Sequence, residues 1–118
     1  MKIGRVHHVS LNVTDLDAAL TFYTDVLEMP VLPRPDFDFP GAWLDAGEQQ
    51  IHLLEVGAFE APKGQHFAIE VDDVAAVSAE LGARGVEVSP ASVIDGVCVQ
   101  AFLSDPSGNL IEINQPLG

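Results

Sequence analysis

The chain is short of basic residues. Five lysines and arginines stand against eighteen acidic residues among its 118, which gives a net charge of −13, and the five form no cluster. Because nucleic acids are bound through clusters of basic side chains, this composition argues against a nucleic-acid partner. It also disfavours strongly anionic substrates such as coenzyme A thioesters and mildly favours cationic or neutral ones.

The chain also has a single cysteine and no long apolar run. Cys98 lies in the apolar segment Val97-Cys98-Val99, which predicts a buried thiol, and an intrachain disulfide is excluded. No segment could span a bilayer, and residues 1–5 lack the apolar stretch of a signal peptide. We therefore expect a cytoplasmic protein without a membrane partner, folded as one compact domain over residues 1–118.

An internal repeat carries most of the histidines. The segment His-Val-Ser-Leu-Asn-Val-Thr-Asp at residues 8–15 returns as His-Phe-Ala-Ile-Glu-Val-Asp-Asp at residues 66–73. Further along, Ile51-His52-Leu53 returns as Ile111-Glu112-Ile113. The two repeats thus place a potential metal ligand at the same two positions. The two repeats cover about residues 1–57 and 65–118, with a linker at residues 58–64.

Each half is predicted to form a strand, a helix and three further strands. The first strand of each half alternates apolar and polar residues. A helix with apolar residues at spacings of three and four follows it, capped by Thr14 or Asp15 in the first half and by Asp72 or Asp73 in the second. Gly85 ends the second helix. The predicted elements are strand 6–13, a helix with apolar positions 16–27, strands 31–33, 42–45 and 50–56, strand 65–71, a helix with apolar positions 74–81, and strands 86–88, 97–104 and 109–114.

Strand alternation predicts where the candidate ligands point. Successive side chains of a strand lie on opposite faces, so His8 and His66 face away from the apolar residues that pack under the helices. The same reasoning places His52 and Glu112 on that outer face, whereas His7 is predicted on the face opposite to His8, with a structural role. Three imidazoles and a carboxylate suit zinc, nickel, iron, cobalt or manganese and disfavour calcium and magnesium.

Three segments together resemble the vicinal oxygen chelate superfamily, which includes glyoxalase I, bleomycin-resistance proteins, fosfomycin-resistance enzymes and extradiol dioxygenases. They are residues 7–16, Phe22-Tyr23 with Val26-Leu27, and residues 105–112 (Asp-Pro-Ser-Gly-Asn-Leu-Ile-Glu). Residues 34–44 are most similar to glyoxalase-I-like members. The resemblance implies an α+β fold, in which two βαβββ repeats form a curved mixed sheet around a cavity.

The resemblance also implies a site. It assigns one divalent transition metal per site to His8, His52, His66 and Glu112, with the alternative that His52 only approaches the substrate. It implies a small-molecule substrate that chelates this metal, and a homodimer in which subunits can share sites. Glyoxalase I usually has a carboxylate or carboxamide where this chain has His52, and this departure leaves Glu112 as the only carboxylate of the set.

Residues 34–44, within the first repeat, offer substrate contacts. Phe37, Phe39 and Trp43 can wall an apolar pocket, or instead pack in the core and protect an edge strand. Arg34 can contact a substrate carboxylate or lie solvated on the surface.

Three functions follow from these residues. The first is a metal-dependent lyase or isomerase of glyoxalase-I type, with Glu112 as general base. The second is an extradiol dioxygenase that uses His8, His66 and Glu112, although only His7 then remains for acid–base work. The third is a non-catalytic dimer that binds a cationic, planar drug, as in bleomycin resistance.

Overall fold

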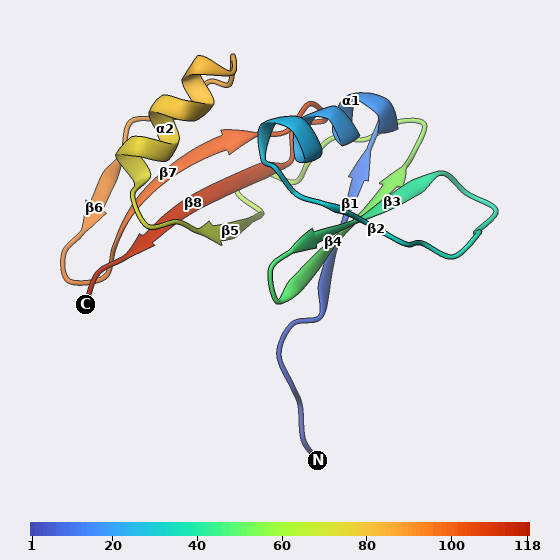
Figure 1. Cartoon of the computed structure of the whole chain (residues 1–118), viewed down its shortest axis with the longest axis horizontal. Coiled ribbons are helices and arrows are strands. Elements are labelled where there is room, and N and C mark those ends of the chain that lie inside the picture. The colour runs from blue at the N-terminus through green and yellow to red at the C-terminus, as the bar shows by residue number, and fades with distance from the viewer. The chain divides into compact units, whose positions relative to one another are not determined.

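The computed structural model describes residues 1–118 as two compact units, Met1–Glu60 and Ala61–Gly118. Each unit contains one copy of the repeat as a four-stranded mixed sheet with its own helix (Figure 1). The boundary between the units falls inside the predicted linker. No helix of the chain is long and apolar enough to cross a membrane.

The first unit has the strand order β1-β4-β3-β2, with β1 parallel to β4 and the other pairs antiparallel. Its helix α1 packs against β3 and β4, and a π-helical turn, η1, continues α1 without a break. Tyr23 and Leu44 are completely buried in its core. The elements are β1 (His8–Val13), α1 (Leu16–Thr21), η1 (Phe22–Val26), β2 (Val31–Leu32), β3 (Gly41–Ala46) and β4 (Gln49–Glu55).

The second unit repeats this arrangement, with the order β5-β8-β7-β6 and β5 parallel to β8. Its helix α2 packs against β7 and β8, which is visible in Figure 1. Val74 and Ile111 are completely buried, and Cys98 is buried as predicted. The elements are β5 (His66–Glu70), α2 (Val74–Ala83), β6 (Ser92–Ile94), β7 (Cys98–Ser104) and β8 (Leu110–Pro116).

The predicted strand at residues 86–88 is wrong, because β6 lies at Ser92–Ile94 instead. The tight turn at Asp95-Gly96, where Gly96 has φ 72°, pairs Ser92 with Gln100 and so places β6 against the start of β7. Pro90 has no N–H to donate and interrupts any longer ladder. Residues 86–88 therefore follow the end of α2 without pairing as a strand.

Each helix is tied to the last strand of its own repeat. Asp15 and Asp73 are the N-caps, accepting hydrogen bonds from the backbone N–H groups three residues later. Glu55 Oε2, at the end of β4, accepts a second bond of 2.8 Å from the N–H of Leu16. In the second unit the equivalent residue, Gln115, accepts from the N–H of Val74 at 3.0 Å. These contacts fix the helix on one face of each sheet and leave the other face to the candidate ligands.

Candidate metal centre

The four candidate ligands occupy equivalent places in the two units. In the first unit His8 lies opposite Gln50 on the adjacent parallel strand, and His52 lies two residues further along. In the second unit His66 lies opposite Leu110, with Glu112 two residues further along. Since side chains two residues apart share a face, each unit brings its own two candidates together on one side of its sheet.

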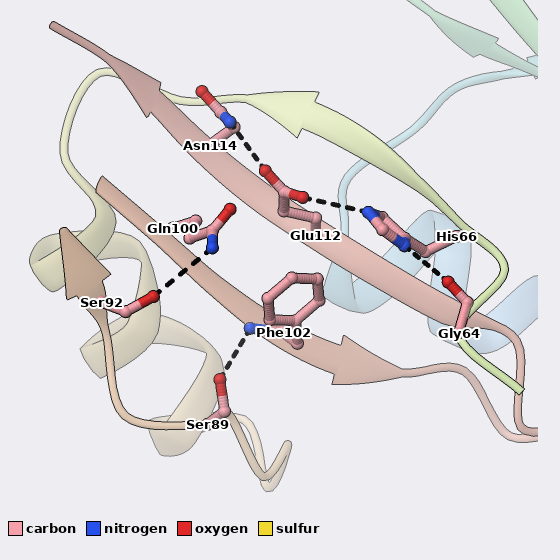
Figure 2. Close-up of polar contacts among 8 residues, drawn as sticks. All are labelled: Gly64, His66, Ser89, Ser92, Gln100, Phe102, Glu112 and Asn114. Carbon is pink, nitrogen blue, oxygen red and sulfur yellow. Dashed lines mark hydrogen bonds and ion pairs between the residues drawn. The ribbon is translucent and has the colours of Figure 1, made fainter. Parts of the chain in front are cut away.

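The pair in the second unit, His66 and Glu112, is polar, and hydrogen bonds from neighbouring residues hold both side chains (Figure 2). His66 Nε2 lies 3.1 Å from Glu112 Oε1, and the other carboxylate oxygen accepts a 2.7 Å bond from Asn114 Nδ2. On its far side, the ring donates from Nδ1 to the backbone oxygen of Gly64 at 2.9 Å. Glu112 is only 7% exposed, so its charge is held among these partners and not by bulk water.

This pair fits a metal ion. A metal-binding histidine usually donates its second N–H to a carbonyl or carboxylate, which fixes the ring and its tautomer. Gly64 does this for His66 and leaves Nε2 facing Glu112. Since both nitrogens of the ring face acceptors, it can donate to both only when doubly protonated, and a metal ion at Nε2 would replace one of these protons.

The pair in the first unit is stacked. The rings of His8 and His52 lie 4.0 Å apart at 15°, and Trp43, opposite His52 on β3, stacks on the same imidazole at 4.2 Å and 6°. His52 is thus held between two rings and is 8% exposed. Parallel rings cannot both direct an in-plane nitrogen lone pair at one ion. Joint coordination by His8 and His52 therefore requires one ring to turn.

His52 is further held in its neutral form. Burial lowers its pKa from the ordinary value, and electrostatic interactions with His8, His7 and Arg34 lower it further. Gln50 Oε1 lies 2.8 Å from His52 Nε2, so a neutral ring donates its proton there. Each of the two histidines therefore has one ring nitrogen without a hydrogen-bond partner, Nε2 of His8 and Nδ1 of His52.

His7 does not lie on the opposite face from His8, so that prediction is wrong. The two Nδ1 atoms are 2.9 Å apart and the rings meet edge to face at 5.2 Å. The reason is that β1 begins at His8, and strict alternation of faces applies only inside the strand.

The predicted substrate residues gather in the first unit beside His52. The guanidinium of Arg34 lies over the rings of Phe37 and Phe39, at 4.8 and 5.0 Å from their centroids, and donates to the Phe39 carbonyl at 3.0 Å. Phe37 lies 6.2 Å from Trp43, which continues the row of rings to His52. Each phenylalanine is 42% exposed, which fits a surface wall better than a core. Arg34 is neither a freely solvated arginine nor an open carboxylate clamp, because two rings cover it.

No group of three or more histidine, cysteine, aspartate or glutamate side chains that could hold a metal forms in the chain. The candidates come as two pairs. Sequence reasoning missed the residues that orient these pairs, Gln50, Asn114 and Gly64. Gln50 and Asn114 each lie two residues from a candidate ligand on the same strand, so period-two alternation could have identified them.

A family model described as the Glyoxalase/Bleomycin resistance protein/Dioxygenase superfamily matches residues 5–113. The chain belongs to this superfamily. The match includes all four candidate ligands, and it agrees with the fold. A glyoxalase family protein from Bacillus anthracis superposes with a TM-score of 0.88 and 27% identity over 98% of both chains. Two four-stranded mixed sheets of this kind are the vicinal oxygen chelate fold.

Similar members of the superfamily have different names. A probable lactoylglutathione lyase of Vibrio cholerae is 35% identical, over 98% of this chain and 93% of its own length. An antibiotic binding protein from Streptomyces has a TM-score of 0.81 and 30% identity over 98% of both chains. The chain spans only 35% of the length of a probable chloroplastic lactoylglutathione lyase of Arabidopsis thaliana, with 34% identity.

Proposed function

We propose that the protein is a metal-dependent lyase or isomerase of glyoxalase-I type, acting on a small carbonyl compound or its thiol adduct. The observation that carries this proposal is the His66–Glu112 pair, with its 3.1 Å separation and its outer contacts to Gly64 and Asn114. The relatives named as lactoylglutathione lyases support the same chemistry.

The proposed metal ligands are His8, His66 and Glu112, with His52 as a fourth once its ring turns away from Gln50. A divalent transition metal bound there would supply Lewis acidity that polarises a substrate carbonyl. The donor set of imidazole and carboxylate suits zinc, nickel, iron, cobalt or manganese.

Glu112 is the proposed general base. Its carboxylate would take a proton from the carbon beside the substrate carbonyl and return it to the neighbouring carbon, so the substrate is isomerised without an oxidant or reductant. Asn114 Nδ2, at 2.7 Å, holds one carboxylate oxygen and leaves the other facing His66. The rings of Trp43, Phe37 and Phe39 would line the apolar side of the substrate.

The test combines metal analysis with an activity assay. Untagged wild-type protein should contain about one equivalent of a transition metal per site, and a His66→Ala variant should lose it. Formation of lactoylglutathione from glutathione and methylglyoxal is then followed in the reconstituted protein. Glu112→Gln should reduce turnover by about 10²–10⁴-fold. Glu87→Gln, which removes one exposed carboxylate, is the matched control and should leave turnover unchanged. Full turnover in Glu112→Gln would exclude this residue as the base.

We further propose a homodimer, in which each site takes one ligand pair from each subunit. Mixing the inactive variants His8→Ala and Glu112→Ala distinguishes this arrangement from sites built within one chain. A hybrid dimer with shared sites has one site with every ligand intact, so activity returns after subunit exchange. If each chain builds its own site, every site keeps one defect and the mixture stays inactive.

A second candidate function is drug binding without catalysis. It is favoured by the partly exposed rings of Phe37 and Phe39 beside the Trp43–His52 stack, which offer aromatic surface to a planar ligand, and a cationic ligand would displace the Arg34 guanidinium from these rings. The antibiotic binding protein from Streptomyces supports it. Calorimetry with a planar cationic antibiotic and metal-free protein tests it. Tight binding that Trp43→Leu abolishes would favour this function over the lyase, and no binding would remove it.

A further inference from the structure

The histidine before the first candidate ligand is not accounted for by the proposed reaction. His7 is exposed and precedes β1, yet its Nδ1 lies 2.9 Å from Nδ1 of His8, with the rings edge to face. Two imidazole nitrogens at this distance share one proton, so one of them donates and the other accepts. The direction of this bond fixes the tautomer of His8.

The direction matters for metal binding. A neutral imidazole carries a proton on one nitrogen and can bind a metal only through the other. Nδ1 of His8 is engaged by His7, and Nε2 has no hydrogen-bond partner. If His8 donates from Nδ1 to His7, its Nε2 carries a lone pair. If it accepts, Nε2 carries the proton and cannot bind a metal.

The second unit shows the same arrangement with a different partner. Nδ1 of His66, which is equivalent to His8, donates to the backbone oxygen of Gly64 at 2.9 Å and leaves Nε2 facing Glu112. In both repeats a residue just before the strand lies within hydrogen-bond distance of Nδ1 of the strand's first histidine. In the first repeat that residue is His7.

We propose that His7 is a positioning residue, whose Nδ1 accepts the Nδ1 proton of His8 and so presents Nε2 of His8 for metal binding. The proposal rests on the proposed metal centre. It also accounts for how the ring of His8 is oriented, because His7 contacts its edge while His52 stacks on its face. His7 itself does not touch the metal.

The first measurement needs no metal. Long-range ¹H–¹⁵N correlation spectra of the metal-free protein report which nitrogen of His8 is protonated. We expect the Nδ1–H tautomer in the wild type and in His7→Asn, whose amide oxygen stands close to the position of Nδ1. We expect a shift toward the Nε2–H tautomer in His7→Phe, which keeps a ring but has no acceptor. A predominantly Nε2–H tautomer in the wild type would overturn the proposal.

The second measurement is the affinity for Co²⁺ alone, by competition with a coloured chelator. His7→Phe should weaken binding by about 10–100-fold, as the loss of an outer partner of a ligand does, and His7→Asn should restore it. The His8→Ala variant distinguishes an error in the proposed metal centre from an error in the role of His7. If His8→Ala binds Co²⁺ like the wild type, the proposed metal centre is wrong. If His8→Ala loses the metal while His7→Phe binds it normally, only the role of His7 is wrong.

Discussion

The carboxylate of Asp105 organises the turn that joins β7 to β8, the strand that carries Glu112. Its Oδ1 accepts hydrogen bonds from the backbone N–H of Ser107 at 2.9 Å and of Asn109 at 2.8 Å, and its Oδ2 accepts from Asn109 Nδ2 at 2.9 Å. Asp105 is 5% exposed and Asn109 is 8% exposed. The turn is therefore held by one buried side chain together with two backbone bonds, from the N–H of Asp105 to the Asn109 carbonyl and from the N–H of Gly108 to the Asp105 carbonyl.

Replacing Asp105 by alanine should destabilise the fold strongly. Both donors of Asn109 would be left buried without this acceptor, at about 1–3 kcal/mol each, so the expected loss is about 2–6 kcal/mol. The N–H of Ser107 is less buried and can turn to water. In Asp105→Asn the retained oxygen still accepts both backbone bonds, and only the side chain of Asn109 loses its partner, which costs about 1–3 kcal/mol. A typical domain is stable by about 5–15 kcal/mol, so the alanine variant should remain folded only marginally.

The assay is urea denaturation followed by far-ultraviolet circular dichroism. Asp38→Ala is the control, because it removes an exposed carboxylate and should change the free energy of unfolding by less than about 0.5 kcal/mol. The expected order of stability is wild type and Asp38→Ala, then Asp105→Asn, then Asp105→Ala. A loss below about 1 kcal/mol in Asp105→Ala would refute the buried-donor reasoning.

Three further predictions concern stability. Glu28 has φ 61°, a left-handed conformation that costs a side chain about 1–2 kcal/mol, so Glu28→Gly should raise the urea midpoint while Glu28→Ala should not. A Cβ on Gly41 would overlap the carbonyl oxygen of Leu53, so Gly41→Ala should cost about 1–3 kcal/mol, whereas Gly57→Ala meets open space and should be neutral. Because the pKa of His52 is lowered, the unfolded chain binds more protons below about pH 6.5, and acidification should destabilise the wild type more than His52→Gln. Equal losses in both proteins would contradict this last prediction.

The repeat made most of the fold predictable. Period-two alternation identified the first and fourth strands of each half, and both helices begin at one of the two caps expected for each, Asp15 and Asp73. The prediction of a strand at residues 86–88 failed because it used only the local alternation of apolar residues. The register of β6 is decided instead by the turn at Asp95-Gly96. A short strand on a sheet edge gains its position from its partner and not from its own pattern.

The face of the candidate site was also predictable, but not its internal contacts. Alternation alone places His8 and His66 outside, since it depends only on the strand in which they lie. The stack of Trp43 on His52 depends on how β3 pairs with β4, which no pattern within either strand reveals. The contact of His7 with His8 lies at a strand end, where alternation no longer applies.

The two repeats differ in the candidate ligand on their fourth strand, His52 in the first and Glu112 in the second, and this difference separates the proposed roles of the two pairs. On the third strand of each unit an aromatic residue stands opposite the fourth-strand candidate, Trp43 opposite His52 and Phe102 opposite Glu112. An imidazole can stack on an aromatic ring, and His52 does so on Trp43. A carboxylate gains nothing from the face of a ring, because that face is itself negative, so Glu112 turns instead to Asn114 and His66. The same backbone therefore holds one candidate in an aromatic stack and the other in a polar pair, which is why we place the proton-transfer chemistry on Glu112 and not on its counterpart in the first repeat.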